Sequence, residues 1–403
     1  MNKKIYKVLC LNIFLTILSC ERHEIELIIH NSSWPEGTII SLIHGDRILS
    51  RSSLYGGHVR LRISQNNMYR IRAASRTSLT FLSEPITFTN DKNSFILPSH
   101  LPRKRRGTWR LGLSLCMDST DSLYEYLLKQ RGSPFTTLSP DLMNNTHLKV
   151  TTRQAHAKGI EITACVPVST QDLPHILSLA DSAVAYGVDG IVVEPDSVML
   201  FSDKFDDRIR ELANILHARG LTFSLRYTVN CDAGHLSIPQ KLRHILSEIP
   251  VPEQADELRI SFLCDGISST NSTESIEEKI SELQKEHIPL SRISIELLLS
   301  AYKFRILDNN DLRLDALKPG ELQELLRESG GSGIIRLRDG SLRFGYRGML
   351  YVFDDDETVT QKISLLRTGI FSRSGGIHIV FDDLGVAPDS LTIMKIAQIM
   401  KLP

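Results

Sequence analysis

Two acidic residues end an apolar segment near the middle of the chain. The segment Tyr186 to Asp196, YGVDGIVVEPD, has the composition of a buried strand and finishes with Glu194 and Asp196. Side chains two positions apart on a strand point to the same side, so both carboxyl groups face one way. Such a pair can act as general acid and base if one carboxyl group has a raised pKa. Glu194 and Asp196 are therefore the candidate catalytic residues.

The strand that carries this pair belongs to a series of apolar strands that alternate with amphipathic helices. We expect eight strands, at Arg110–Met117, Phe135–Leu138, Glu161–Val166, Gly190–Glu194, Thr222–Tyr227, Glu257–Cys264, Arg292–Leu299 and Gly376–Phe381. Eight such units favour a TIM barrel over an open sheet, and there is no glycine-rich phosphate loop to favour a dinucleotide-binding fold. In a TIM barrel the chemistry lies at the carboxyl ends of the strands, where this acidic pair is expected.

The interval between the seventh and eighth strands is too long for a single helix. We predict a helix at Pro319 to Glu328, followed by a hairpin of Ile334 to Arg338 and Ser341 to Phe344 that turns at Asp339-Gly340. The predicted fold class is thus α/β: a TIM barrel over 108–403 with a small α+β insertion at about 303–355.

No residue pattern predicts a metal or another cofactor. Asp354 to Asp356 resembles a cation cluster, but Asp356 precedes an amphipathic helix as an N-cap and the run lacks EF-hand spacing. The cysteines after Cys20 are widely spaced without a CxxC pair, and no HExxH motif occurs. We therefore expect no cofactor.

The N-terminal residues predict export. Three lysines precede an apolar run from Val8 to Leu18 that is too short to cross a bilayer and has the flanks of a signal peptide. The sequence Ile-Leu-Ser-Cys that follows is similar to a bacterial lipobox. We predict a signal peptide at 1–19 and lipidation of Cys20, with ordinary secretion as the alternative. The expected location is extracytoplasmic, as a periplasmic or surface lipoprotein that contacts the membrane through its lipid alone.

The sequence pattern of residues 20–102 predicts a small all-β domain. Ile25 to Ile29 and Val59 to Ile63 alternate apolar and polar residues, and turn-forming clusters lie between such segments. About six short strands here favour a β-sandwich, which serves as a binding module or as a spacer. A basic linker at 103–107 joins it to the barrel. The 47 basic residues balance the 47 acidic ones, so no net charge attracts the protein to nucleic acid.

The order of features from Leu111 to Leu384 resembles glycoside hydrolase family 18, particularly its peptidoglycan- and spore-cortex-directed branch related to chitinases. The family signature DGxDxDxE has its frame at Asp189 to Asp196. Phe262 to Asp265 falls where the family has Met-x-Tyr-Asp, and Gly375 to Val380 tracks the segment leading to its last strand.

The resemblance implies hydrolysis of β-linked N-acetylglucosamine chains, in which the acetamido oxygen of the sugar is the nucleophile. It places Asp196 at the position of the acid, Glu194 at that of the residue orienting the acetamido group, and Cys264 at that of a tyrosine. Asp265 matches the family pattern and is an expected substrate contact. Tyr227 and Tyr302, which follow the fifth and seventh strands, are further expected sugar contacts at the mouth.

Several departures from the family pattern argue against catalysis. Asp196 is one methylene shorter than the usual glutamate, and a misplacement of about 1 Å can cost on the order of a hundredfold in rate. Cys264 is a weak hydrogen-bond donor, and Val192 replaces an aspartate of the family pattern. Val380 stands where the family has a tryptophan that packs beneath the sugar ring. We therefore expect a degenerate barrel that binds a glycan, either peptidoglycan or a chitin-like oligosaccharide, or a protein. Two alternatives stay open: an active hydrolase using Asp196 and Glu194, and a purely structural envelope lipoprotein.

Overall fold

The chain divides into two compact units. A computed structural model describes residues 24–30, 34–45, 47–64, 67–75, 78–90, 92–98, 109–115, 135–140, 142, 148–168, 173–195, 204–230, 255–263, 273–285, 288–298, 301–306, 312–317, 321–337, 340–369 and 375–381. The first unit is Met1–Ala73 with Phe81–His100, and the second is Ala74–Thr80 with Leu101–Pro403. Among the described residues, no helix has the length and apolar character needed to cross a membrane.

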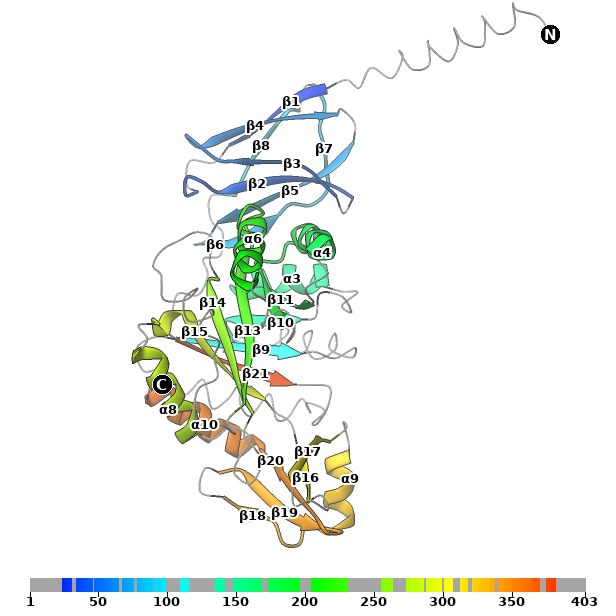
Figure 1. Cartoon of the computed structure of the whole chain (residues 1–403). Coiled ribbons are helices and arrows are strands. Elements are labelled where there is room, and N and C mark those ends of the chain that lie inside the picture. Colours follow the sequence, from blue (N-terminus) through cyan, green and yellow to red (C-terminus); the bar gives the residue numbers. More distant parts are fainter. Residues whose placement is uncertain are drawn as a thin grey trace, which may run out of the picture. The chain divides into compact units, whose positions relative to one another are not determined.

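The N-terminal strands form two sheets (Figure 1). One has the order β4-β1-β8, and the other has the order β3-β2-β5-β6 with β7 paired to β5. These strands are β1 Glu24–His30, β2 Ile39–His44, β3 Arg47–Ser53, β4 His58–Ser64, β5 Met68–Ser75, β6 Ser78–Leu82, β7 Ile86–Thr87 and β8 Ser94–Ile96. Alternation places Leu61 and Ile63 in the core while Arg60 and Arg62 face solvent, as period-two patterning predicts. The predicted β-sandwich is confirmed.

The second unit contains a closed barrel with the strand order β10-β11-β12-β13-β14-β15-β21-β9, and all eight predicted strands take part in it. The strands are β9 Trp109–Leu115, β10 Thr137–Pro140, β11 Glu161–Val168, β12 Gly190–Pro195, β13 Thr222–Asn230, β14 Glu257–Leu263, β15 Ile293–Leu298 and β21 Gly375–Phe381. Neighbouring strands run parallel throughout. The predicted TIM barrel is therefore confirmed.

Helices lie between the barrel strands along the sequence. They are α3 Leu148–His156, α4 Leu173–Tyr186, α6 Phe205–His217, α8 Thr273–Lys285 and α10 Asp356–Thr368, with a short 3-10 turn η2 at Leu290–Arg292. On α6, Phe205, Ile209, Leu212 and Leu216 are buried on one face, spaced as an amphipathic helix requires. Outward-facing strand residues such as Phe223 and Leu225 are also fully buried, so the main apolar core lies between the barrel and its helices.

Two helix-to-strand connections at the amino-terminal end of the barrel repeat the same structure and nearly the same sequence. Residues 156–160 read HAKGI and residues 217–221 read HARGL. In both, the glycine adopts a positive φ, 73° at Gly159 and 68° at Gly220, which lets the chain leave the helix directly. The next residue, Ile160 or Leu221, returns its N–H to a carbonyl of the preceding helix.

Each repeated connection is fastened to the next strand by an aspartate. His156 contacts Asp189 at 2.7 Å, and His217 contacts Asp256 at 2.8 Å. The same carboxylate oxygens also accept the backbone N–H of Ile162 and of Phe223, respectively, at 2.9 Å. Asp189, the first residue of the signature frame, is thus a structural clamp at the end of the barrel opposite the mouth.

The segment between β15 and β21 forms its own sheet, in the order β17-β16-β20-β19-β18. The elements are β16 Tyr302–Ile306, β17 Leu312–Ala316, α9 Glu321–Glu328, β18 Ile335–Arg336, β19 Leu342–Tyr346 and β20 Met349–Phe353. Leu322 of α9 belongs to the core cluster that contains Phe344 and Tyr351, whose rings stack with centroids 4.9 Å apart. The predicted α+β insertion is confirmed; β16, β17 and β20 extend it beyond the predicted helix and hairpin.

The acidic run that resembles a cation cluster has structural roles on the described chain. Asp355 caps α10 by accepting the N–H of Thr358 at 2.8 Å, one residue earlier than the predicted cap at Asp356. Asp354 accepts from Ser341 at 2.6 Å and pairs with the fully buried Lys362 at 2.8 Å. Both carboxylates are therefore engaged with protein donors.

Candidate functional site

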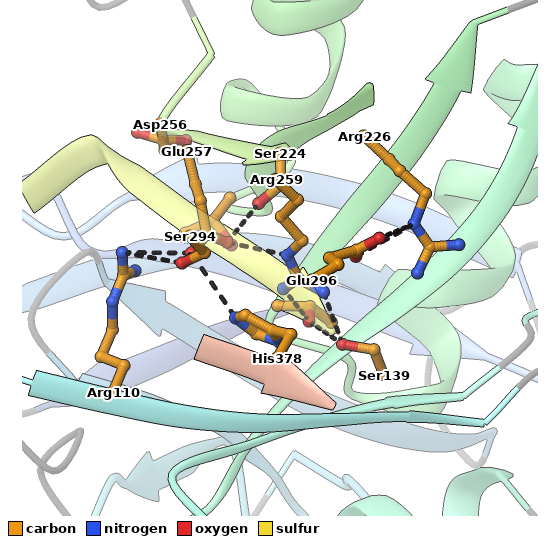
Figure 2. A network of polar contacts seen from close by, with 12 residues as sticks. Arg110, Ser139, Ser224, Arg226, Asp256, Glu257, Arg259, Ser294, Glu296 and His378 are labelled. Carbon is orange, nitrogen blue, oxygen red and sulfur yellow. Dashed lines mark hydrogen bonds and ion pairs between the residues drawn. The ribbon is translucent and has the colours of Figure 1, made fainter. Parts of the chain in front are cut away.

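The interior of the barrel is polar, although bulky apolar side chains are usual there. Figure 2 shows how arginine, glutamate, serine and histidine side chains from several strands converge within it. Glu257, Arg259, Glu296 and His378 are all nearly or completely buried. Buried charges are costly unless they are paired and hydrogen-bonded, so the contacts of each of these groups decide what the interior can do.

Glu257, the first residue of β14, is the centre of the part of the network nearer the amino-terminal ends of the strands (Figure 2). Its carboxylate lies 3.1 Å from Arg110 on β9 and 3.0 Å from Arg259, and it accepts the hydroxyls of Ser224 and Ser294. Burial by itself would raise the pKa of this carboxyl, but the two guanidinium groups hold the pKa well below its usual value. Glu257 is consequently an anion and not a proton donor near neutral pH.

Arg259 joins Glu257 to the opposite wall of the barrel. Its terminal nitrogens donate to Ser139 on β10 at 2.7 Å and to Thr163 on β11 at 2.8 Å. Together with the Nε bond to Glu257, these bonds engage all three guanidinium nitrogens. Arg259 therefore crosslinks strands on opposite sides of the lumen.

Glu296 on β15 is the centre of the part of the network nearer the carboxyl ends of the strands. Its carboxylate lies 2.9 Å from Nε of Arg226 on β13, and it accepts the hydroxyl of Ser261 at 2.8 Å. Here too burial would raise the pKa of the carboxyl, but Arg226 and Arg259 lower it below the usual value. Both buried glutamates of the network are thus held ionised.

His378 on β21 packs against a glycine on the neighbouring strand. A Cβ on Gly112 would lie 1.9 Å from Nδ1 of His378, so only glycine leaves room for this ring. The Nε2 atom lies 3.7 Å from Glu257. Burial and the nearby Arg259 lower the pKa of His378 from 6.5 to about 4, so the ring is neutral at neutral pH.

Glu194 is the candidate catalytic residue that the structure describes, and it lies near the carboxyl end of β12. Its side chain is 53% exposed, and its carboxylate is 3.6 Å from Arg226. Val192, two residues earlier on the same side of the strand, is buried. Among the described residues, Glu194 is thus a solvent-accessible carboxylate at the mouth, and the buried Val192 lies below it on the same strand.

The two tyrosines expected at the mouth have other surroundings in the described structure. Tyr227 alternates with the lumen-facing Arg226, which places it on the outer side of β13. Tyr302 is 7% exposed and belongs to a cluster with Phe304 and Val352 on the insertion sheet. Neither observation tests sugar binding, so both assignments stay predictions.

The other residues of the predicted site, Asp196, Cys264, Asp265 and the lipidation residue Cys20, lie outside the described residues. Val380 is part of β21, but its side chain lies outside the described set. Within the described chain, no group of three or more histidine, cysteine, aspartate or glutamate side chains is placed to hold a metal ion.

The ion network was not foreseen from the sequence, although one strand carries a signal of it. In β14, ELRISFL, Glu257, Arg259 and Ser261 alternate with apolar residues. Parallel barrel strands are usually apolar on both faces, so charged residues with period two indicate a polar interior. The partners are harder to find, because Arg226 and Glu296 are 70 residues apart.

The buried histidine predicts a pH dependence of barrel stability. The unfolded chain protonates His378 near pH 6.5 and the folded barrel near pH 4, so stability falls as the pH falls through this window. The expected loss is about 3 kcal/mol of unfolding free energy. Below about pH 4.5, protonation of Glu257 and Glu296 adds to the loss, because both pKa values are lower in the fold than in the unfolded chain.

Urea unfolding measured between neutral pH and pH 4 checks this. The reporter is the fluorescence of Trp109 on β9, in a Trp34→Phe background, since the chain has two tryptophans. His378→Gln flattens the dependence above pH 4.5, whereas the matched variant His58→Gln, at an exposed position of the first unit, leaves it unchanged. An unaltered slope in His378→Gln would contradict the assignment.

No family model and no curated protein matches the sequence. Solved structures match the fold. The C-terminal domain of a putative chitinase from Desulfitobacterium hafniense DCB-2 matches with a TM-score of 0.55 at 12% identity, covering 73% of this chain and 99% of that one. The chitinase of Chromobacterium violaceum ATCC 12472 gives 0.52 at 14% identity, covering 72% of this chain and 99% of that one.

The Bacillus cereus spore cortex-lytic enzyme SleL gives a TM-score of 0.51 at 12% identity, covering 72% of this chain and 75% of that one. Structural matches at identities this low establish the fold but not the reaction. The fold that these matches establish is that of a divergent glycoside hydrolase family 18-like barrel.

Proposed function

We propose that this protein is a cell-envelope lipoprotein whose family 18-like barrel binds an N-acetylglucosamine-containing glycan without hydrolysing it. The observation that carries the proposal is the state of the interior carboxylates. Glu257 and Glu296 are buried, paired with arginines and held below their usual pKa. Glycosidic bond cleavage needs a carboxylic acid with a raised pKa, and neither interior glutamate supplies it, so that role would fall to Glu194 and Asp196 at the mouth.

The mouth supports binding more than catalysis. Glu194 is half-exposed there and lies within ion-pair distance of Arg226, whose Nε contacts Glu296. A half-exposed carboxylate beside a guanidinium offers acceptor oxygens to the hydroxyl and amide hydrogens of a sugar. The sequence departures at Asp196 and Cys264 point the same way.

An active hydrolase is the second candidate, favoured by the exposed position of Glu194 at the carboxyl end of its strand. In that case Glu194 and Asp196 act as an ordinary carboxyl pair on one strand. Binding and turnover assays on the same oligosaccharide distinguish the two candidates.

Binding of chitotetraose, the N-acetylglucosamine tetramer, tests the proposal. We expect a dissociation constant of about a millimolar or below by calorimetry, with no new reducing ends after prolonged incubation. Glu194→Ala weakens binding about fivefold, in line with the loss of roughly 1 kcal/mol of hydrogen bonding. The matched variant Glu211→Ala, at an exposed position on α6, leaves the affinity unchanged.

Two results would overturn the proposal in different directions. Turnover of the tetramer that disappears in both Asp196→Ala and Glu194→Gln would identify an active hydrolase. Absence of any binding to chitotetraose or to peptidoglycan fragments at millimolar concentration would favour a structural scaffold.

The proposed anchor has a separate test. In a bacterial expression host, the full-length protein partitions into the detergent phase and incorporates labelled palmitate, because Cys20 carries the lipid. Cys20→Ser abolishes both, and Cys10→Ser, within the predicted signal peptide, changes neither. Release of the unmodified wild-type protein into the aqueous phase would instead identify ordinary secretion.

A further inference from the structure

We propose that Glu194 makes the mouth selective for a glucosamine unit whose amine is free, over one whose amine is acetylated. The ligand class is thus a de-N-acetylated stretch of an amino-sugar glycan. This inference rests on the proposed glycan binding and specifies the group recognised at the same site.

The charges of the described network alternate from one end of the barrel to the other. Arg110 pairs with Glu257, which pairs with Arg259; Glu296 pairs with Arg226, which approaches Glu194. His378 is neutral near neutral pH and adds no charge. The series therefore begins with a cation and ends, at the mouth, with an anion.

Glu194 is the least compensated member of this series. Its described ion-pair partner is Arg226 at 3.6 Å, a guanidinium that lies closer to Glu296, at 2.9 Å. Among the described residues, no hydrogen bond reaches the Glu194 carboxylate, whereas Glu257 and Glu296 both accept from serines. Arg226 is shared by two carboxylates and lies closer to Glu296, so the charge of Glu194 is only partly compensated.

Glu194 is also the most accessible of the three groups. Its side chain is 53% exposed, while Arg226 is 9% exposed and Glu296 is fully buried. A ligand approaching this part of the mouth therefore meets the carboxylate, and the guanidinium is shielded from it. The field at this point favours a cation.

The two forms of the sugar nitrogen differ in what they offer a carboxylate. A protonated amine carries a positive charge and three N–H donors, whereas an acetamide is neutral and has one N–H donor. Hydrogen bonds between ionised groups are about twice as strong as neutral ones. A half-exposed carboxylate with unused acceptor capacity consequently prefers the amine.

Calorimetry on the full chain, with the fully deacetylated glucosamine tetramer and with chitotetraose, tests the preference at mildly acidic pH and low salt. We expect the glucosamine tetramer to bind about tenfold more tightly. Glu194→Gln, which keeps the size and removes the charge, abolishes the preference, while Glu211→Gln on α6 retains it. The preference also decreases in high salt, because the site is half-exposed.

Each alternative result overturns the inference in a recognisable way. Equal or tighter binding of chitotetraose would refute the preference while leaving glycan binding intact. A preference that Glu211→Gln abolishes as well would assign it to the overall charge of the surface. A lysine tetrapeptide that binds as tightly as the glucosamine tetramer would indicate a cationic peptide ligand. Failure of both sugars to bind would refute the proposed function together with the inference.

Discussion

The series of alternating charges inside the barrel is the interaction on which the rest of the structure depends. Removing one partner of a buried ion pair leaves an uncompensated charge, at a cost of about 3–5 kcal/mol. Arg259 bonds to β10 and β11 while pairing with Glu257 on its own strand, and Arg226 on β13 pairs with Glu296 on β15. Six barrel strands are crosslinked once Ser224, Ser294 and Arg110 are included. The network therefore specifies barrel closure, and apolar packing against the helices supplies the driving force.

This arrangement also limits the chemistry at the mouth. Carboxylates that hold a barrel together must stay ionised, whereas a general acid must keep its proton until the bond breaks. The interior carboxylates, Glu257 and Glu296, are thus used to hold the barrel together. Glu194 is the described carboxylate of the network that solvent and ligand can reach. The proposed function then depends on the ligand that Glu194, at the outer end of the series, attracts.

The barrel was predictable from sequence because its outward strand faces are strictly apolar and its helices are amphipathic. The predicted site was only partly accessible to the same reasoning. Glu194 lies near the carboxyl end of its strand as expected, but the contact of Asp189 with His156 was not anticipated. Ion pairs such as Arg226 with Glu296 join residues far apart in sequence, and periodicity carries no information about them. Strands β16 and β17 were missed although both alternate apolar and charged residues, because each is only five residues long and a period-two pattern that short is a weak signal.

The most direct measurement of the central claim is a pH titration of the glutamate carboxyl groups by carbon NMR, with assignments from Glu257→Gln and Glu296→Gln. The two interior carboxyls are predicted to remain ionised down to pH values below the usual glutamate range, because Arg110, Arg226 and Arg259 hold their pKa values down. A signal assigned to either residue that titrates above its ordinary pKa would contradict the account, since the interior would then contain the proton donor that hydrolysis requires.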